Sequence, residues 1–127
     1  SPAHQFVRST VRGELELSAR TAGLSGSDRD RAVGDMLDRL ALGAHAQANP
    51  FTLSGGQQRR LSVATALIAK PSVLILDEPT FGQDANTWVQ LVDLMRELAG
   101  QGRAVVALTH DDHLVATADR RIELVRQ

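Results

Sequence analysis

The sequence predicts an α/β fold in which helices come first and part of a parallel sheet follows. Two apolar runs, residues 73–77 and 104–109, each end in polar residues, and a helical stretch separates them. Strand, helix, strand in this order is typical of parallel strands joined by a crossover helix. Residues 1–50 contain helical patterns and turns but no convincing strand. We therefore expect a helical segment followed by a sheet with flanking helices.

Composition limits the kinds of protein that this chain can be. It has 127 residues, of which 43% are apolar and 23% charged, which is an ordinary globular balance. The net charge of −1 gives no support for a nucleic-acid-binding surface. There is no cysteine for a disulfide or a thiolate metal site, and no apolar run approaches the roughly 20 residues of a spanning helix. The polar start without methionine argues against a signal peptide and predicts a fragment.

The first half of the chain predicts two helices. The first covers about residues 10–20 and is broken by the glycines and serines of residues 23–27. The second runs from residue 27 or 28 to Leu42, with apolar residues at helical spacing and Gly43 in the place of a C-cap glycine. Residues 44–52 are expected to form a loop.

The second half predicts alternating helices and strands. Proline, glycine and capping residues separate these segments and fix their expected ends. The expected elements are a helix from Ser54 to about Ala69, a buried strand to Asp77, a helix over 85–99, a buried strand over 104–109, a short helix over 112–118 and a last strand over 121–125. Trp88 lies on the apolar face of the 85–99 helix and is assigned to the core without a function.

The third helix opens with a small polar turn, Leu-Ser-Gly-Gly-Gln-Gln, at residues 53–58. The Ser54 hydroxyl can cap the first turn, and Gly55 and Gly56 leave room for a backbone or a phosphate to approach. Free N–H groups and the helix dipole favour an anion at such a position. An ordinary capped helix start is the simpler alternative for so short a motif.

Carboxylates follow the first strand directly, at Asp77 and Glu78, and His110 follows the second strand. The carboxyl ends of parallel strands form the ligand-binding edge of an α/β sheet. The alternatives are solvated loop charges for the two acids and a structural or exposed side chain for the histidine.

Taken together, the turn at 53–58, the helix after it and Leu74-Ile-Leu-Asp-Glu-Pro-Thr80 resemble the nucleotide-binding subunit of ATP-binding cassette (ABC) transporters. The resemblance implies a P-loop NTPase-like fold. Residues 1–52 would be a segment of the helical subdomain, and residues 53–127 the C-terminal part of the catalytic core.

The resemblance also implies roles for single residues. Asp77 would hold Mg²⁺ through a water molecule, and Glu78 would be the general base for the attacking water. His110 would be the switch histidine that contacts the γ-phosphate. Asp84 would belong to a loop, residues 80–84, that crosses between two subunits, although it serves equally well as a helix cap.

In this family the turn acts on the nucleotide of a second subunit. Ser54, Gly55, Gly56 and Gln57 would close over ATP held by that subunit, which implies a head-to-tail dimer. Arg59 and Arg60 could add positive charge there, but solvated helix residues are the simpler interpretation. The implied cofactors are ATP and Mg²⁺. The implied partners are a second ABC ATPase and an integral membrane subunit, without nucleic acid, for a peripheral protein on the cytoplasmic face of the membrane.

One motif of the family is missing. The sequence contains no G-x-x-x-x-G-K-[ST], and its only lysine is Lys70. Residues 1–6 resemble the segment just after the family's glutamine loop. We therefore expect a C-terminal part of an ABC ATPase that does not hydrolyse ATP alone. Strand edges left without their neighbours would favour aggregation or non-native dimers, and a compact monomer at all concentrations would count against this.

The sequence also suggests a subgroup of the family and leaves two other functions open. Residues 4–7 and 80–84 resemble the ATPases of energy-coupling-factor importers of vitamins and metal ions, and Gln83 replaces the leucine commoner in the wider family. The first rival is a non-catalytic docking or dimerisation module of a transporter complex. The second is an ABC ATPase of DNA maintenance, which would bring coiled coils or cysteine zinc sites that this sequence lacks.

Overall fold

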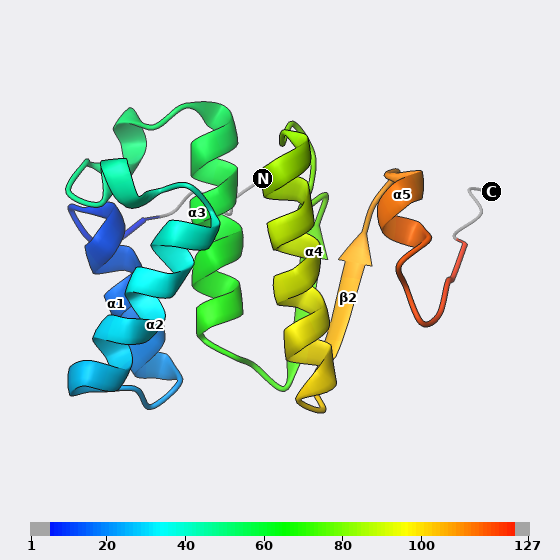
Figure 1. Cartoon of the computed structure of the whole chain (residues 1–127), viewed down its shortest axis with the longest axis horizontal. Helices are drawn as coiled ribbons and strands as arrows, with labels where there is room; N and C mark the ends of the chain where they lie inside the picture. The colour runs from blue at the N-terminus through cyan, green and yellow to red at the C-terminus, as the bar shows by residue number, and fades with distance from the viewer. Residues whose placement is uncertain (1–5, 124–127) are drawn as a thin grey trace.

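The structure is a computed structural model that describes residues 6–123. Its helices and strands follow the predicted order (Figure 1). They are α1 (Val11–Thr21), α2 (Gly26–Arg39), the 3₁₀ turns η2 (Gly43–His45) and η3 (Pro50–Thr52), α3 (Gly55–Ile68), β1 (Val73–Asp77), α4 (Ala85–Gly100), β2 (Ala104–Leu108) and α5 (Asp112–Val115).

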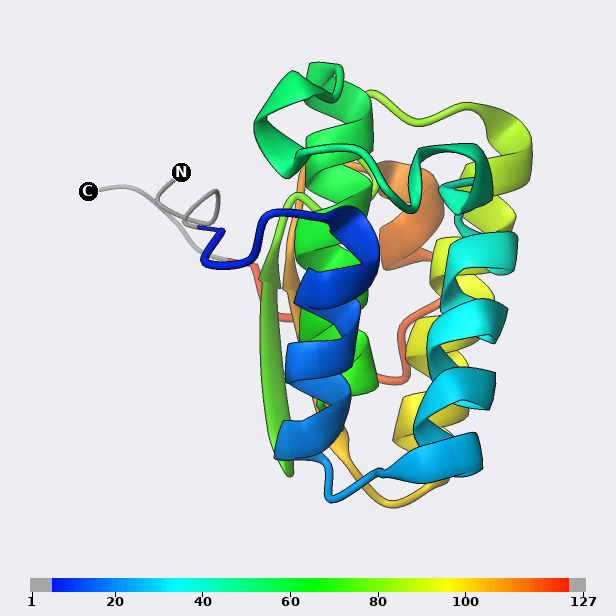
Figure 2. The ribbon, with the colours of Figure 1, turned by 90° about the vertical axis from the view of Figure 1, so that its left-hand side faces the viewer.

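Helix α3 connects the helical part of the molecule to the sheet. It packs against α1 and α2 on one side and against β1 and α4 on the other. Figure 1 shows α1, α2 and α3 gathered at one end, followed by α4, β2 and α5, and Figure 2 shows α1 and α2 running side by side. The helix that opens with the polar turn is therefore in contact with most of the fold.

The two strands are parallel, as predicted. Val73 pairs with Ala104 and Asp77 pairs with Leu108, so the strands end together. The residues that follow them, beginning with Glu78 and Thr109, consequently meet at one edge of the sheet.

The expectation that both strands are buried was wrong for one face of the sheet. Leu74 and Leu76 are buried, whereas Val73 and Ile75 are 60% and 64% exposed. On β2, Val106 and Leu108 are also exposed, at 44% and 48%. The apolar run predicted burial on both sides, but within residues 6–123 helices cover only one face.

Capping residues define the helix starts. The Thr10 hydroxyl accepts a hydrogen bond from the Gly13 amide at 2.9 Å, and the Asp84 carboxylate accepts one from the Thr87 amide at 2.8 Å. Asp84 is therefore the helix cap that the sequence allowed.

Helix α2 ends three residues before the predicted Leu42, and Gly43 is not its C-cap glycine. Ala41 takes the left-handed conformation instead, with φ of 55°. The Leu42 amide donates to the Leu37 carbonyl at 2.8 Å and the Ala41 amide to the Asp38 carbonyl at 3.2 Å, which is a Schellman motif. Leu40 and Leu42 are fully buried on either side of Ala41, and this burial offsets the strain of the turn.

The remaining differences concern short segments. Residues 44–52, expected as a loop, include η3 and most of η2. The helix expected over 112–118 stops at Val115. Residues 121–123 are exposed and form no strand, and the rest of the expected strand over 121–125 lies outside the described residues.

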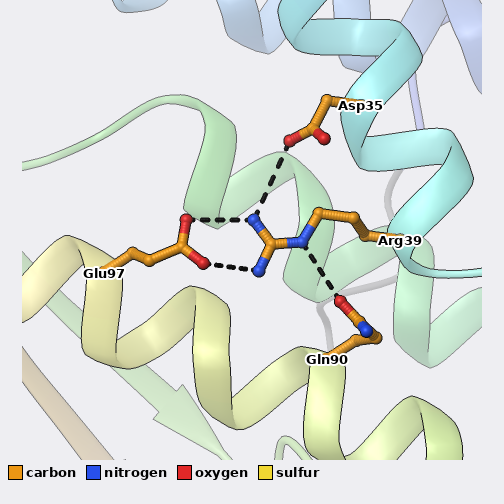
Figure 3. A network of polar contacts seen from close by, with 4 residues as sticks. All are labelled: Asp35, Arg39, Gln90 and Glu97. Carbon is orange, nitrogen blue, oxygen red and sulfur yellow. Dashed lines mark hydrogen bonds and ion pairs between the residues drawn. The ribbon is translucent and has the colours of Figure 1, made fainter.

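An ion-pair network fastens α2 to α4 (Figure 3). The Arg39 guanidinium donates to both carboxylate oxygens of Glu97, at 2.9 and 2.5 Å, and its Nε donates to Gln90 at 3.2 Å. Asp35 lies 3.8 Å away on the same helix as Arg39. The hydrogen bonds between Arg39 and Glu97 raise the pKa of Arg39 and lower that of Glu97. The network links the helical part to α4, the helix that packs against β2.

Candidate nucleotide site

A capping box shapes the start of α3, here called turn 54–57. The Ser54 hydroxyl accepts from the Gln57 amide at 3.2 Å, and the Gln57 side-chain oxygen accepts from the Ser54 amide at 2.9 Å. The Gln57 side-chain nitrogen lies 3.1 Å from Nε2 of His45, which fixes the far end of the amide. The Ser54 hydroxyl thus caps the first turn, as the sequence predicted.

The two glycines of turn 54–57 offer free donors and open space. Neither the Gly55 nor the Gly56 amide donates a hydrogen bond to any part of the chain that the structure describes. A Cβ on Gly55 would meet nothing within 4 Å, and one on Gly56 would approach the Gly82 carbonyl only to an ordinary 3.8 Å. Outside α3, the only described backbone atom that borders the space left by the two glycines is the Gly82 carbonyl. The turn suits an anion from outside.

Glu78 stands at the end of β1 in a left-handed backbone conformation, with φ of 48°. Its amide donates to the Leu108 carbonyl at 2.8 Å and extends the ladder by one residue. Its carboxylate accepts from the Thr109 hydroxyl at 3.0 Å and from the His110 amide at 3.1 Å. The two strand ends are therefore joined through the Glu78 side chain. Strain of this kind in a non-glycine residue clusters at functional sites.

The Asp77 side chain, unlike that of Glu78, lies exposed at the end of β1. Asp77 is exposed and its carboxylate contacts no donor among residues 6–123. These residues contain no cluster of three histidine or acidic side chains that could hold a metal ion. Mg²⁺ usually takes only one or two protein carboxylates and completes its shell with waters and phosphate oxygens. A single free carboxylate at a strand end fits that need.

Arg59 connects α3 to the same strand end. Its guanidinium donates to the Glu78 carbonyl at 3.0 Å and lies 5.4 Å from the centre of the Phe81 ring, a cation–π distance. The expectation of a solvated residue was wrong for Arg59 and equally for Arg60, which is hydrogen-bonded to Leu40 and Gln83. Both arginines bind positions 19–23 residues away in the sequence. Sequence spacing carries no signal for such contacts.

Asp111 is a residue that the sequence analysis missed. One of its carboxylate oxygens accepts from the Thr80 hydroxyl at 2.7 Å and from the Trp88 indole at 2.8 Å. The other accepts from the amides of His113 and Leu114, which begin α5. The Trp88 hydrogen bond, followed by the Thr80 bond, lowers the pKa of Asp111. Trp88 is thus half-buried beside the core and also positions the residue next to His110.

The other predicted site residues lie on the surface around this edge. The His110 ring is exposed, and only its amide takes part in the contacts above. Asp84 is exposed at the end of residues 80–84, called loop 80–84, and hydrogen bonds from Thr87 lower its pKa. A hollow of about 390 Å³ between α2, α3 and α4 is lined by none of the predicted site residues.

Comparison with known proteins decides the family. The family described as ABC transporter matches residues 2–81, well over half of the chain. This chain belongs to the ABC transporter family. YkoD of Bacillus subtilis, named for HMP/thiamine import and ATP binding, is 40% identical over 92% of this chain, which covers 21% of that relative. MacB of Nitrosomonas europaea, named a macrolide export ATP-binding/permease protein, is 37% identical over 95% of this chain and 18% of its own length.

Solved ABC structures share the fold. The structure of an ATP-binding subunit of an ABC transporter superposes with a TM-score of 0.75 at 26% identity, over 87% of this chain and 46% of that one. A dimeric ATP-binding cassette with ADP and Pi bound gives a TM-score of 0.72 at 27% identity, over 90% of this chain and 52% of its own. The ABC fold predicted from the sequence is confirmed. The chain spans about half of these solved chains and about a fifth of the curated relatives.

No helix within residues 6–123 is both long and apolar enough to cross a bilayer.

Proposed function

We propose that this chain is part of an ATP-hydrolysing subunit that drives solute transport across a membrane. One observation supports this most directly: the Glu78 carboxylate is oriented by the Thr109 hydroxyl and the His110 amide. Glu78 then acts as general base toward the attacking water, with the His110 side chain against the γ-phosphate. Asp77 would hold Mg²⁺ through a water molecule.

Bound Mg²⁺ neutralises phosphate charge in such a reaction. The chain's own residues supply the geometry. Arg59 holds the backbone of Glu78 against α3. Asp111, the residue after His110, holds Thr80 and Trp88 near the end of β2. The 127 residues contain no G-x-x-x-x-G-K-[ST], so the phosphate cradle is proposed to come from another segment or subunit, and this piece alone to be inactive.

Turn 54–57 is proposed to bind the nucleotide of a second ABC ATPase. The free amides of Gly55 and Gly56, held in place by the Ser54–Gln57 capping box, favour an anionic ligand. Asp84, in loop 80–84, would face the same second subunit. The solved relatives that are named as dimers agree with such an arrangement.

The transported solute is proposed to be a micronutrient that enters the cell. YkoD is named for HMP/thiamine import, and loop 80–84 carries the Gln83 that suggested an energy-coupling-factor importer. The export proteins among the relatives are the competing case. In either case the chain would be peripheral, on the cytoplasmic face of the membrane, and bound to an integral membrane subunit.

The test is Mg²⁺-dependent ATP turnover by the complete protein that carries this sequence, compared with its Glu78→Gln variant. Loss of a general base is expected to lower kcat by about 10²- to 10⁴-fold. Glu16→Gln is the matched control, since Glu16 lies on α1 and makes no hydrogen bond or ion pair with any described residue. Equal turnover in all three proteins would reject Glu78 as the base. ATP binding without turnover in the unchanged protein would favour the docking module.

A further inference from the structure

Gln83 joins loop 80–84 to turn 54–57. Its side-chain nitrogen donates to the Gly56 carbonyl at 3.2 Å and to the Phe81 carbonyl at 3.4 Å. Its side-chain oxygen accepts from the Arg60 guanidinium at 3.0 Å. Both ends of one amide are therefore engaged, and the three partners lie in two segments of the chain that are more than 20 residues apart.

Arg60 is itself fixed from behind. Its Nε donates at 2.8 Å to the carbonyl of Leu40, the C-cap residue of α2. The preceding residue, Arg39, is bound to Glu97 of α4. Gln83 thus receives its hydrogen bond from a side chain that is also hydrogen-bonded to the C-cap of α2.

Loop 80–84 and the start of α3 are in ordinary van der Waals contact at this place. The nearest atoms to a Cβ built on Gly56 are the Gly82 carbonyl at 3.8 Å and, at 4.0 Å, the Gln83 side-chain nitrogen and an Arg60 nitrogen. Gly82 has φ of 73°, which turns the chain so that Gln83 points back to α3 while Asp84 begins α4. A larger residue at Gly82 would be strained in this conformation.

We propose that Gln83 is a positioning residue that locks loop 80–84 to turn 54–57, so that both segments present a fixed surface to the nucleotide and loop of a second subunit. This rests on the proposed function, in which both segments face that subunit. Gln83 touches no nucleotide in this account. It acts through the Gly56 carbonyl, and it makes the position of the turn depend on the position of the loop.

Three variants of the complete protein distinguish the contributions of the Gln83 hydrogen bonds. Gln83→Leu removes every hydrogen bond of the amide at similar volume. Gln83→Glu keeps an acceptor for Arg60 but replaces the donor to Gly56 with a carboxylate oxygen, which repels that carbonyl. Gln101→Leu is the matched control, because Gln101 is exposed after α4 and its side chain has no hydrogen bond among the described residues.

The first readout is amide hydrogen exchange, which does not depend on activity. Gln83→Leu and Gln83→Glu are expected to speed exchange in residues 54–58 and 81–84 together, and to leave α1 unchanged. Faster exchange in 81–84 alone would overturn the proposal, because the loop would then move without the turn. Recovery of wild-type exchange by Gln83→Glu would overturn the role of the Gly56 contact.

The second readout is steady-state ATP hydrolysis. A misplaced turn is expected to lower kcat about tenfold with little change in KM, since an error of 1 Å in a positioning group is enough for such losses. An unchanged kcat in Gln83→Leu would overturn the proposal. If the unchanged protein hydrolyses no ATP, the proposed function fails, and the exchange experiment still decides whether Gln83 couples the two segments.

Discussion

Single residues that follow the strand ends make many of the hydrogen bonds that hold the local structure. Asp111 shows this best, because its carboxylate accepts four hydrogen bonds, from the Thr80 hydroxyl, the Trp88 indole and the amides of His113 and Leu114 in α5. A charged acceptor shared by several donors is worth more to stability than a neutral one.

Replacing this carboxylate tests its contribution. Asp111→Asn puts an amide NH₂ where only acceptors fit, and it is expected to reduce the free energy of unfolding by about 1–3 kcal/mol. Denaturant unfolding at neutral pH measures this, with Asp112→Asn as control, because Asp112 is exposed and its side chain accepts no hydrogen bond among the described residues. If Asp111→Asn reduced the free energy of unfolding no more than Asp112→Asn does, the role assigned to the Asp111 hydrogen bonds would be contradicted.

The same residue gives a pH dependence with a defined sign. The pKa of Asp111 is lowered in the folded state, chiefly by the Trp88 hydrogen bond. Its stabilisation is therefore present above the unfolded aspartate pKa of about 3.9 and is lost as the pH falls through the lower folded value. The difference in unfolding free energy between wild type and Asp111→Asn should shrink over that range. A constant difference would contradict the lowered pKa.

At the scale of elements, the fold depends on how α3 and α4 are held. The Arg39–Glu97 pair is the main polar contact from α2 to α4 (Figure 3). Glu97 is 53% exposed, so water screens the pair and limits its value.

A double-mutant cycle measures that value. Arg39→Gln and Glu97→Gln should show a coupling of about 0.5–1 kcal/mol in urea unfolding, and it should fall at high salt because exposed charges are screened. The Asp28–Arg31 pair of the same helix is a suitable control, since its side chains are 71% and 76% exposed and their coupling should be close to zero. If the coupling energy of Arg39–Glu97 were also close to zero, apolar packing alone would orient α4.

The sequence predicted the bounds of the helices and strands more closely than it predicted their burial and packing. The bounds of β1 agree with the prediction because Pro71 and Glu78–Pro79 flank a continuous apolar run. The end of α2 was wrong because Ala41, not a glycine, supplies the left-handed residue, and only the burial of Leu40 and Leu42 makes this favourable. Single-sequence patterns do not show such tertiary compensation.

The candidate site was predictable in part. The types and spacing of Ser54, Asp77 and Glu78 indicated it, since each stands at the end of a recognisable element. The contacts of Arg59 and Gln83 were not predictable, because they depend on how α3 lies against β1 and loop 80–84. The roles of the predicted site residues stay predictions until they are tested.

At the scale of the whole molecule, two surfaces lack a partner among residues 6–123. One is the open sheet face with Val73, Ile75, Val106 and Leu108. The other is the small surface formed by the free Gly55 and Gly56 amides of turn 54–57. The expectation that the chain by itself self-associates through unpaired strands stays a prediction, and the exposed aliphatic face is consistent with it.

The central claim is that turn 54–57 binds the nucleotide of a second subunit. The measurement is the mass of the complete protein, as Glu78→Gln to prevent turnover, by sedimentation velocity with and without Mg²⁺-ATP. Gly55→Asp is the deciding second substitution. A carboxylate in the first turn suits the helix dipole, and a Cβ at residue 55 meets no atom within 4 Å, so we expect the fold to be kept while a phosphate is repelled. Ser27→Asp, in the first turn of α2, is the matched control.

We predict that ATP doubles the mass of Glu78→Gln and of its Ser27→Asp derivative, and leaves the Gly55→Asp derivative a monomer. A dimer that forms equally well with Gly55→Asp, or a mass that ATP does not change although the nucleotide binds, would contradict the claim.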